Sequence, residues 1–213
     1  MEFLTTLAGA FFGALAAFLS EALRRKFEEK NRQYESILAT QATLISQANS
    51  IESVMRRIST QRDANPFDNL KYMLLRFSQQ SIDFTKLTFI GASLEPNLLL
   101  KMDVAQEGFQ FAVGLVEERN KLLDRFFNDP KTELKEFDSE TGAVRATGDP
   151  RILNNLRQMN QTVYTAMQQT IKVNREARDS LYSFGKRQFP KSKLLFVANE
   201  SPLNNSKITC PST

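Results

Sequence analysis

The sequence contains no histidine, and this absence excludes several kinds of catalytic and metal site. Without an imidazole there is no Ser-His-Asp or Cys-His catalysis and no His-ligated zinc. A single cysteine, Cys210, excludes cysteine-held zinc or iron–sulfur clusters and any disulfide within the chain. Neither the P-loop pattern nor G-x-G-x-x-G occurs, so no motif indicates a nucleotide. We therefore expect no cofactor, no metal, no small-molecule substrate and no enzymatic activity.

Glycine and proline are scarce, with eight and seven residues in 213, which argues against an all-β protein with many tight turns. Seventeen phenylalanines and no tryptophan indicate a core of Phe, Leu, Ile and Met. The net charge is +4, and the positive excess lies just after the first hydrophobic run and in the last residues. Nucleic-acid-binding proteins usually carry one extended basic stripe, so we expect no nucleic-acid partner. Two basic ends suit an anionic membrane surface better.

The only long hydrophobic run covers residues 3–20, which include no charged side chain. At about 1.5 Å per residue, it just spans a hydrocarbon core of about 30 Å. Basic residues follow the run and none precedes it, so the positive-inside rule places the amino terminus outside and the remaining domain in the cytoplasm. We predict a single-pass transmembrane anchor at residues 1–23. A buried core helix and a cleaved signal peptide are the alternatives, although Glu2 stands where a signal peptide has a basic residue.

Small residues recur at intervals of four within this run, at Gly9, Gly13 and Ala17. This spacing lets two helix backbones approach closely, which favours packing between transmembrane helices. It predicts a possible homo-oligomer, with an ordinary lipid-facing anchor as the alternative.

Apolar residues at steps of three and four predict four helical segments after the anchor. The first continues from the anchor to about Arg62, with a charged stalk at 24–33 and Gln41 interrupting its apolar series. The others are expected at Phe67–Phe89, Asn97–Phe127 and Pro150–Phe184, the last with Asp149 as N-cap and Gly185 as C-cap. The predicted fold is therefore all-α, with the anchor continuing into an antiparallel, up-and-down bundle of about four helices at 24–185. A looser coiled coil completed by oligomerisation is the alternative.

Alternating helix directions place the long loop 129–149 at the far end of the bundle and bring Gly185 back toward the membrane. The tail, residues 186–213, is basic and apolar and is expected to be flexible. We predict that basic residues at both ends of the bundle segment form one membrane surface, although residues 194–197 of the tail could pack on the bundle instead. These predicted membrane-surface residues are Arg24, Arg25, Lys26, Lys186, Arg187, Lys191 and Lys193.

The leading hypothesis for function is a membrane-tethered, non-catalytic interaction module, such as an adaptor, sensor or assembly factor, that binds a cytoplasmic protein or itself. Long loops on rigid scaffolds often bind partners, so the 129–149 loop is the predicted contact, at Glu136, Phe137, Asp138 and Glu140. The alternative is a membrane-active effector that perturbs the bilayer when it oligomerises. A catalytic bundle would need a buried polar cluster, which the sequence does not show.

Overall fold

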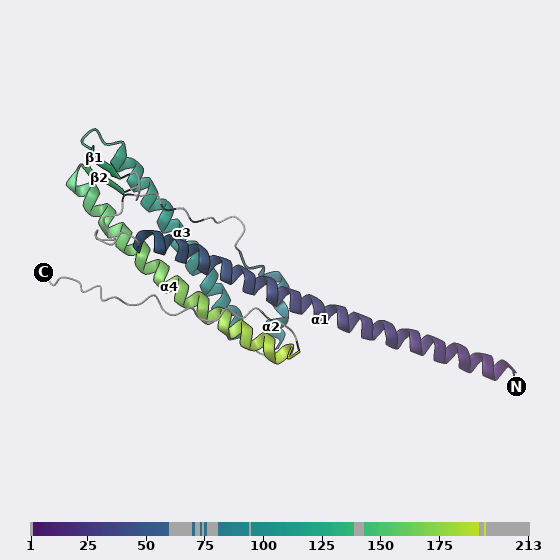
Figure 1. The fold of residues 1–213 in the computed structure, drawn as a ribbon. Coiled ribbons are helices and arrows are strands. Elements are labelled where there is room, and N and C mark those ends of the chain that lie inside the picture. The colour runs from purple at the N-terminus through teal and green to yellow at the C-terminus, as the bar shows by residue number, and fades with distance from the viewer. Residues whose placement is uncertain are drawn as a thin grey trace.

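Three long helices and a small β-hairpin make up most of the fold of the computed structural model (Figure 1). The structure describes residues 2–59, 70, 73, 75, 81–93, 95–138, 143–191 and 194, with the backbone alone at 2–10, 57–59, 134–138 and 143–145. The elements, in chain order, are α1 (Glu2–Ser59), the 3-10 turn η2 (Phe84–Leu87), α2 (Thr88–Ala92), α3 (Pro96–Phe127), β1 (Glu133–Asp138), β2 (Ala143–Thr147) and α4 (Pro150–Gln188).

The long helices form a bundle in which α4 packs along both α3 and α1. α1 and α3 run in one direction and α4 runs in the other, so the hairpin lies at the end of the bundle far from the amino terminus (Figure 1). The predicted, predominantly helical bundle is confirmed, and so is the unbroken helix that leads into it, as far as Ser59. Its predicted end at Arg62 lies outside the described residues.

The sequence pattern of α3 and α4 explains why they form helices and which faces they bury. The apolar residues that recur at intervals of three, four or seven along α3 are all buried: Leu98, Met102, Ala105, Phe109, Ala112, Val116, Leu123 and Phe126. α4 begins as predicted, because the Asp149 side chain accepts a hydrogen bond from the Arg151 backbone N–H at 2.8 Å and Pro150 occupies the first turn. These local signals indicate where α4 begins and which face of α3 is buried.

The core consists of three apolar layers with polar side chains between them. We call them the lower, middle and upper layers, counted from the end nearest the amino terminus. The lower layer includes Ile37, Leu44, Met102, Leu181 and Phe184. The middle layer includes Ile51, Met55, Phe109, Val113, Val163 and Met167, and the upper layer Leu123, Phe126 and Leu156.

The helix predicted at Phe67–Phe89 is wrong at every residue that the structure describes before Phe84. Leu70, Met73, Leu75 and residues 81–83 are not helical, and the described helical turns of this segment are η2 and α2. Apolar residues of this segment nevertheless contribute to the core, since Met73 and Ile82 are buried.

Amides of α3 replace the hydrogen bonds that a helix would supply to this segment. Asn120 accepts from the Met73 N–H at 3.2 Å and donates to the Met73 carbonyl at 2.6 Å. Gln106 Oε1 accepts from the Ile82 N–H at 3.1 Å. Buried backbone groups must be paired, and side chains far along the sequence meet that requirement here.

The prediction that Gly185 is the C-cap of α4 is wrong, because the helix continues to Gln188. Phe189 follows the last turn, and its N–H donates to the Gly185 carbonyl at 2.8 Å. A Cβ atom at Gly185 would lie 2.7 Å from Leu194 Cδ1 and 3.4 Å from Ile37 Cγ2. Glycine at this point thus lets Leu194 and Ile37 approach the α4 backbone closely, and it does not serve a left-handed turn.

Candidate functional site

The most distinctive surface is the amino-terminal part of α1, which extends beyond the bundle as a single helix (Figure 1). We call residues 2–33 the extension. From residue 11 to residue 32 every residue except Glu21 is exposed. Its large apolar side chains include Phe18, which is 71% exposed, and Leu23 and Phe27, which are 69% exposed. Such a concentration of exposed apolar groups marks a surface that another molecule covers.

In the part of the chain with described side chains, which starts at Phe11, no helix has a stretch long and apolar enough to cross a membrane. The predicted span begins at Phe3, so its residues 3–10 lie outside this part. The single-pass anchor therefore stays a prediction.

The small residues of the extension are uncovered where they are described. A Cβ atom at Gly13 would have nothing within 4 Å, and Ala17 is exposed. The side of the helix at Gly9 lies outside the described side chains. The predicted packing through these residues is untested.

The basic residues at the start of the stalk are organised around one carboxylate. Glu21 forms ion pairs with Arg24 at 3.0 Å and with Arg25 at 2.9 Å, and Lys26 is exposed. The carboxylate compensates part of the positive charge beside the apolar run.

The basic residues at the end of α4 lie at a different level from those of the stalk. The rings of Phe189 and Tyr34 are 5.6 Å apart between centroids, which places the end of α4 beside Tyr34. Arg24 is about 15 Å further along α1, at about 1.5 Å per residue. Lys186 lies over the Tyr182 ring at 5.8 Å, and Lys191 is exposed. Lys193 lies outside the described residues. The predicted membrane surface is therefore divided into two groups along α1.

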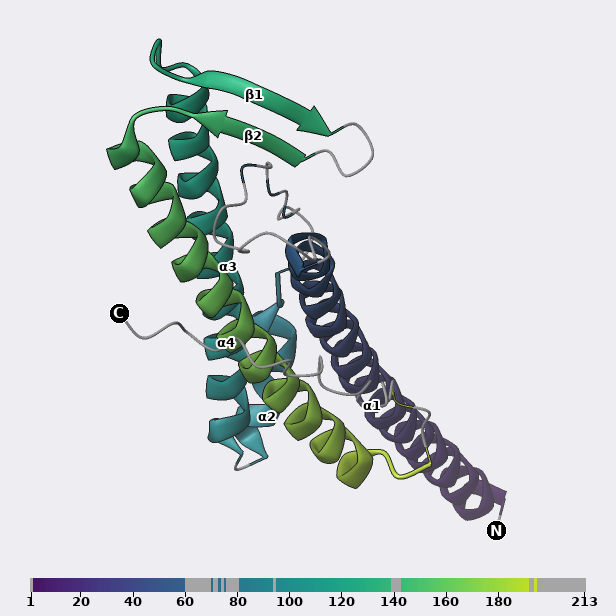
Figure 2. The same cartoon turned by 60° about the vertical axis from the view of Figure 1, so that its left-hand side comes forward.

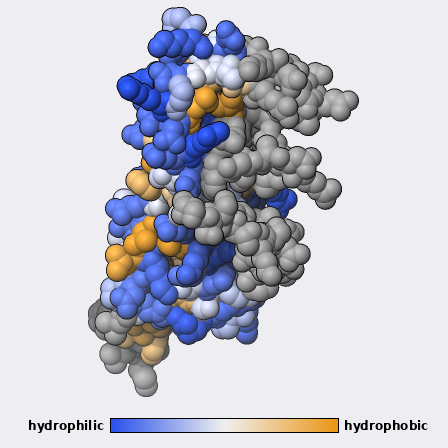
Figure 3. Space-filling model, turned by 90° about the vertical axis from the view of Figure 1, so that its left-hand side faces the viewer, coloured by the Kyte–Doolittle hydropathy of each residue, from blue (hydrophilic) through white to orange (hydrophobic). Residues whose placement is uncertain are grey.

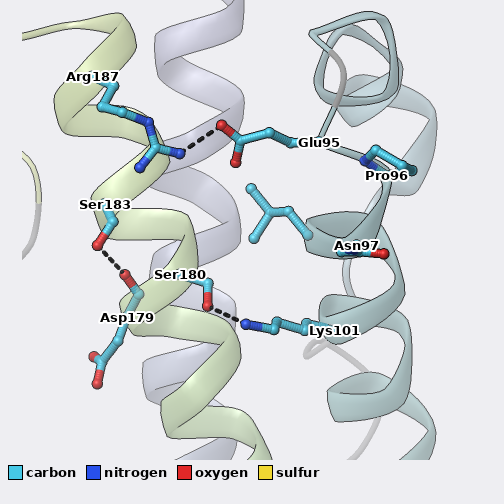
Figure 4. A pocket seen from close by; sticks show the side chains of 9 residues that line it. Glu95, Pro96, Asn97, Lys101, Asp179, Ser180, Ser183 and Arg187 are labelled. Carbon is cyan, nitrogen blue, oxygen red and sulfur yellow. Dashed lines mark hydrogen bonds and ion pairs between the residues drawn. The ribbon is translucent and has the colours of Figure 1, made fainter.

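A cleft of about 500 Å³ lies between the end of α4 and the start of α3 (Figure 4). Arg187 pairs with Glu95 at 2.6 Å across it, and Lys101 donates to Ser180 Oγ at 3.0 Å. Arg187 is thus held by the carboxylate of Glu95, the residue just before α3. Charges of both signs line the cleft, and these contacts join two helices.

The predicted partner loop forms a hairpin that lies across the far end of the bundle (Figure 2). Phe137 pairs with Val144, and Ala146, two residues along the same strand, packs against the upper layer. Directly paired residues share a face of the ribbon, so Phe137 belongs to the row that includes Ala146. Glu136 and Asp138 belong to the opposite row. Glu140 lies outside the described residues.

Sequence reasoning missed the polar side chains inside the bundle. Gln47 Nε2 donates to Gln106 Oε1 at 2.8 Å between the lower and middle layers. Arg119 is fully buried and its Nε donates to Asn160 Oδ1 at 2.8 Å. Burial lowers the pKa of Arg119 to about 10, so the guanidinium is still charged at neutral pH. Position 119 continues the spacing of three and four on α3, which is the signal that could have identified it.

These interior polar groups connect helices, and they do not resemble a catalytic centre. The buried polar residues that the structure describes are amides, threonines and arginines. Within the described ranges, no three His, Cys, Asp or Glu residues gather closely enough to hold a metal ion.

The described surface of the bundle is largely hydrophilic on the side shown in Figure 3, with apolar residues in small patches. No protein-family model matches the chain, and no curated protein or solved structure matches it either. Function is therefore inferred from the chain's own residues.

Proposed function

We propose that this protein is a membrane-tethered, non-catalytic helical interaction module, acting as an adaptor, sensor or assembly factor at the cytoplasmic face. The exposed extension of α1 supports this proposal most directly. Fully burying one large apolar side chain stabilises by about 1.5–3 kcal/mol, and the extension exposes several of them. A lipid bilayer would cover all sides of the helix at once.

Charge favours a bilayer over a protein groove as the environment of the extension. Residues 3–20 carry no charge, and the basic residues Arg24, Arg25 and Lys26 follow directly. A basic cluster beside an apolar helix is typical of its cytoplasmic end. Because Glu21 is paired with two of these arginines, its carboxylate is compensated at the membrane boundary.

The bundle then presents its hairpin away from the membrane. In this arrangement Glu136 and Asp138 are the residues we propose as the contact for a cytoplasmic protein, since their row lies opposite the one that includes Ala146. A polar row on a ribbon supported by a rigid bundle suits a binding role.

Membrane extraction of the full chain tests the tether. We expect the protein to stay in the membrane pellet after an alkaline carbonate wash, and Phe12→Lys combined with Phe18→Lys to release most of it. Phe111→Lys is the matched control, because Phe111 is 62% exposed on α3, outside the extension. Release of the unmodified protein by carbonate would contradict the proposal. A reporter fused to each terminus would then establish the orientation.

The membrane-active effector is the second candidate, and the uncovered Gly13 favours it. If bilayer damage follows from helix packing at this residue, overexpression is toxic and Gly13→Ile relieves the toxicity. Gly114→Ile on α3 is the control, since a Cβ atom there also meets nothing within 4 Å. Harmless overexpression, or equal relief by both variants, argues against the effector.

A further inference from the structure

Gln41 is a polar residue inside the lower apolar layer of the bundle. It is fully buried, and neither its side-chain nitrogen nor its side-chain oxygen has a hydrogen-bond partner. Ile37 and Leu44, four residues before it and three after it, belong to the lower layer. Burying an amide without hydrogen bonds is unfavourable. The packing of α1 on the bundle is therefore weakest at this turn.

Gln47 shows the opposite situation six residues further along the same helix. It is also fully buried, but its Nε2 donates to Gln106 on α3 at 2.8 Å. Its Oε1 accepts from Asn174 Nδ2 on α4 at 3.1 Å. Gln47 thus ties α1 to both other long helices, directly above the turn that Gln41 destabilises.

The start of the tail adds apolar contacts to this same lower layer. Phe189 and Leu194 both pack against it, and the Phe189 ring lies 5.6 Å from that of Tyr34. Gly185 leaves room for Leu194, whose Cδ1 would lie 2.7 Å from a Cβ atom there. These contacts offset the weakness that Gln41 introduces, because they hold α1 and α4 together from outside.

We propose that the lower layer is a latch. The turn of α1 around Gln41 separates from α4 while Gln47 and the middle layer stay closed, and Phe189 and Leu194 hold the closed form. Because Phe189 and Leu194 pack on the lower layer only in the closed form, a partner that binds these two residues shifts the population toward the open form. The latch does not depend on what covers the extension.

Thiol labelling of buried cysteines in the full chain tests the latch. With Cys210→Ser as background, Leu44→Cys reports on the lower layer and Ile51→Cys on the middle layer, since both residues are fully buried on α1. We expect Leu44→Cys to be labelled at least ten times faster than Ile51→Cys. Ile37→Cys is a second lower-layer reporter if Leu44→Cys unfolds the bundle.

Substitutions of the two glutamines then give opposite results. Gln41→Leu removes the unpaired amide and is expected to slow labelling of Leu44→Cys at least ten-fold, with no change at Ile51→Cys. Gln47→Leu leaves Gln106 and Asn174 without this partner and should accelerate labelling at both positions. Leu194→Ala should accelerate labelling at Leu44→Cys only. The latch is wrong if Gln41→Leu leaves the rate at Leu44→Cys unchanged, or slows both positions equally.

Discussion

The two halves of α1 have the same spacing of apolar residues, but these residues are exposed in the first half and buried in the second. Phe11, Leu15 and Phe18 follow one another at steps of four and three, and all are exposed. Leu44, Ala48 and Ile51 follow at the same steps, and all are buried against α3 and α4. Periodicity thus identifies the apolar face of a helix but not the molecule that covers it.

The difference between the halves arises because the neighbouring helix ends. α4 ends at Gln188, next to Tyr34, so it covers α1 no further toward the amino terminus. In the part of the chain that the structure describes, the large apolar side chains from Phe11 to Phe27 therefore stay exposed.

Truncation of matched leucines gives the largest expected difference between the halves. Leu44→Ala should lower the free energy of unfolding by about 2–5 kcal/mol, because it leaves a cavity in the lower layer. Leu15→Ala should change it by less than about 0.5 kcal/mol, as at other exposed positions. Urea unfolding of both variants in the same detergent measures this. Equal losses would mean that the extension packs on the bundle.

Glycine substitutions in the bundle and in the extension should differ in the same sense, with smaller changes in stability. A Cβ atom at Gly148, just before α4, would lie 2.6 Å from the Phe126 ring and 2.7 Å from Thr132 Oγ1. We expect Gly148→Ala to cost about 1–3 kcal/mol through overpacking. Gly13→Ala meets open space and should raise the local helix stability by up to about 1 kcal/mol. Thermal unfolding and helix content by circular dichroism compare the two. A stabilising Gly148→Ala would contradict the packing described here.

Charge removal gives the smallest expected effects. Glu52 lies 2.8 Å from Arg175 and connects α1 to α4 across a partly buried contact, so Glu52→Gln should cost at most about 1 kcal/mol. Glu21 pairs only within the extension. Glu21→Gln should leave the unfolding midpoint of the bundle unchanged.

Much of the fold could be predicted because local signals and burial agree in α3 and α4. The cap at Asp149 and the stripe from Leu98 to Phe126 needed no long-range information. The helix predicted at 67–89 fails at Met73 and Ile82, because these residues are buried in a non-helical backbone that Asn120 and Gln106 of α3 hydrogen-bond. No local pattern indicates a partner about 47 residues away, as between Met73 and Asn120.

The sequence predicts which residues form the candidate site, but it does not predict the distances between them. The exposed apolar extension and its basic boundary follow from composition. The distance between Arg24 and the end of α4 could not be predicted, because it depends on where α4 meets α1, at Tyr34. An irregularity in β1 between Leu134 and Glu136 puts Phe137, and not Glu136, in the same row as Leu134 and Ala146, which a regular strand would not do. Such a bulge shifts the alternation of side chains by one residue.

The charged stalk at 24–33 also sets the angle and the height at which the bundle is held relative to the apolar residues 3–20. One inserted residue turns the bundle by about 100° and lifts it by about 1.5 Å, whereas seven lift it by about 10 Å with a net turn of only about 20°. Alanine insertions after Lys30 thus vary the height and the angle separately. A partner that contacts the bundle and the membrane at once would respond differently to the two kinds of insertion. Comparing them would show whether the height of the bundle or its rotation about the helix axis matters for binding.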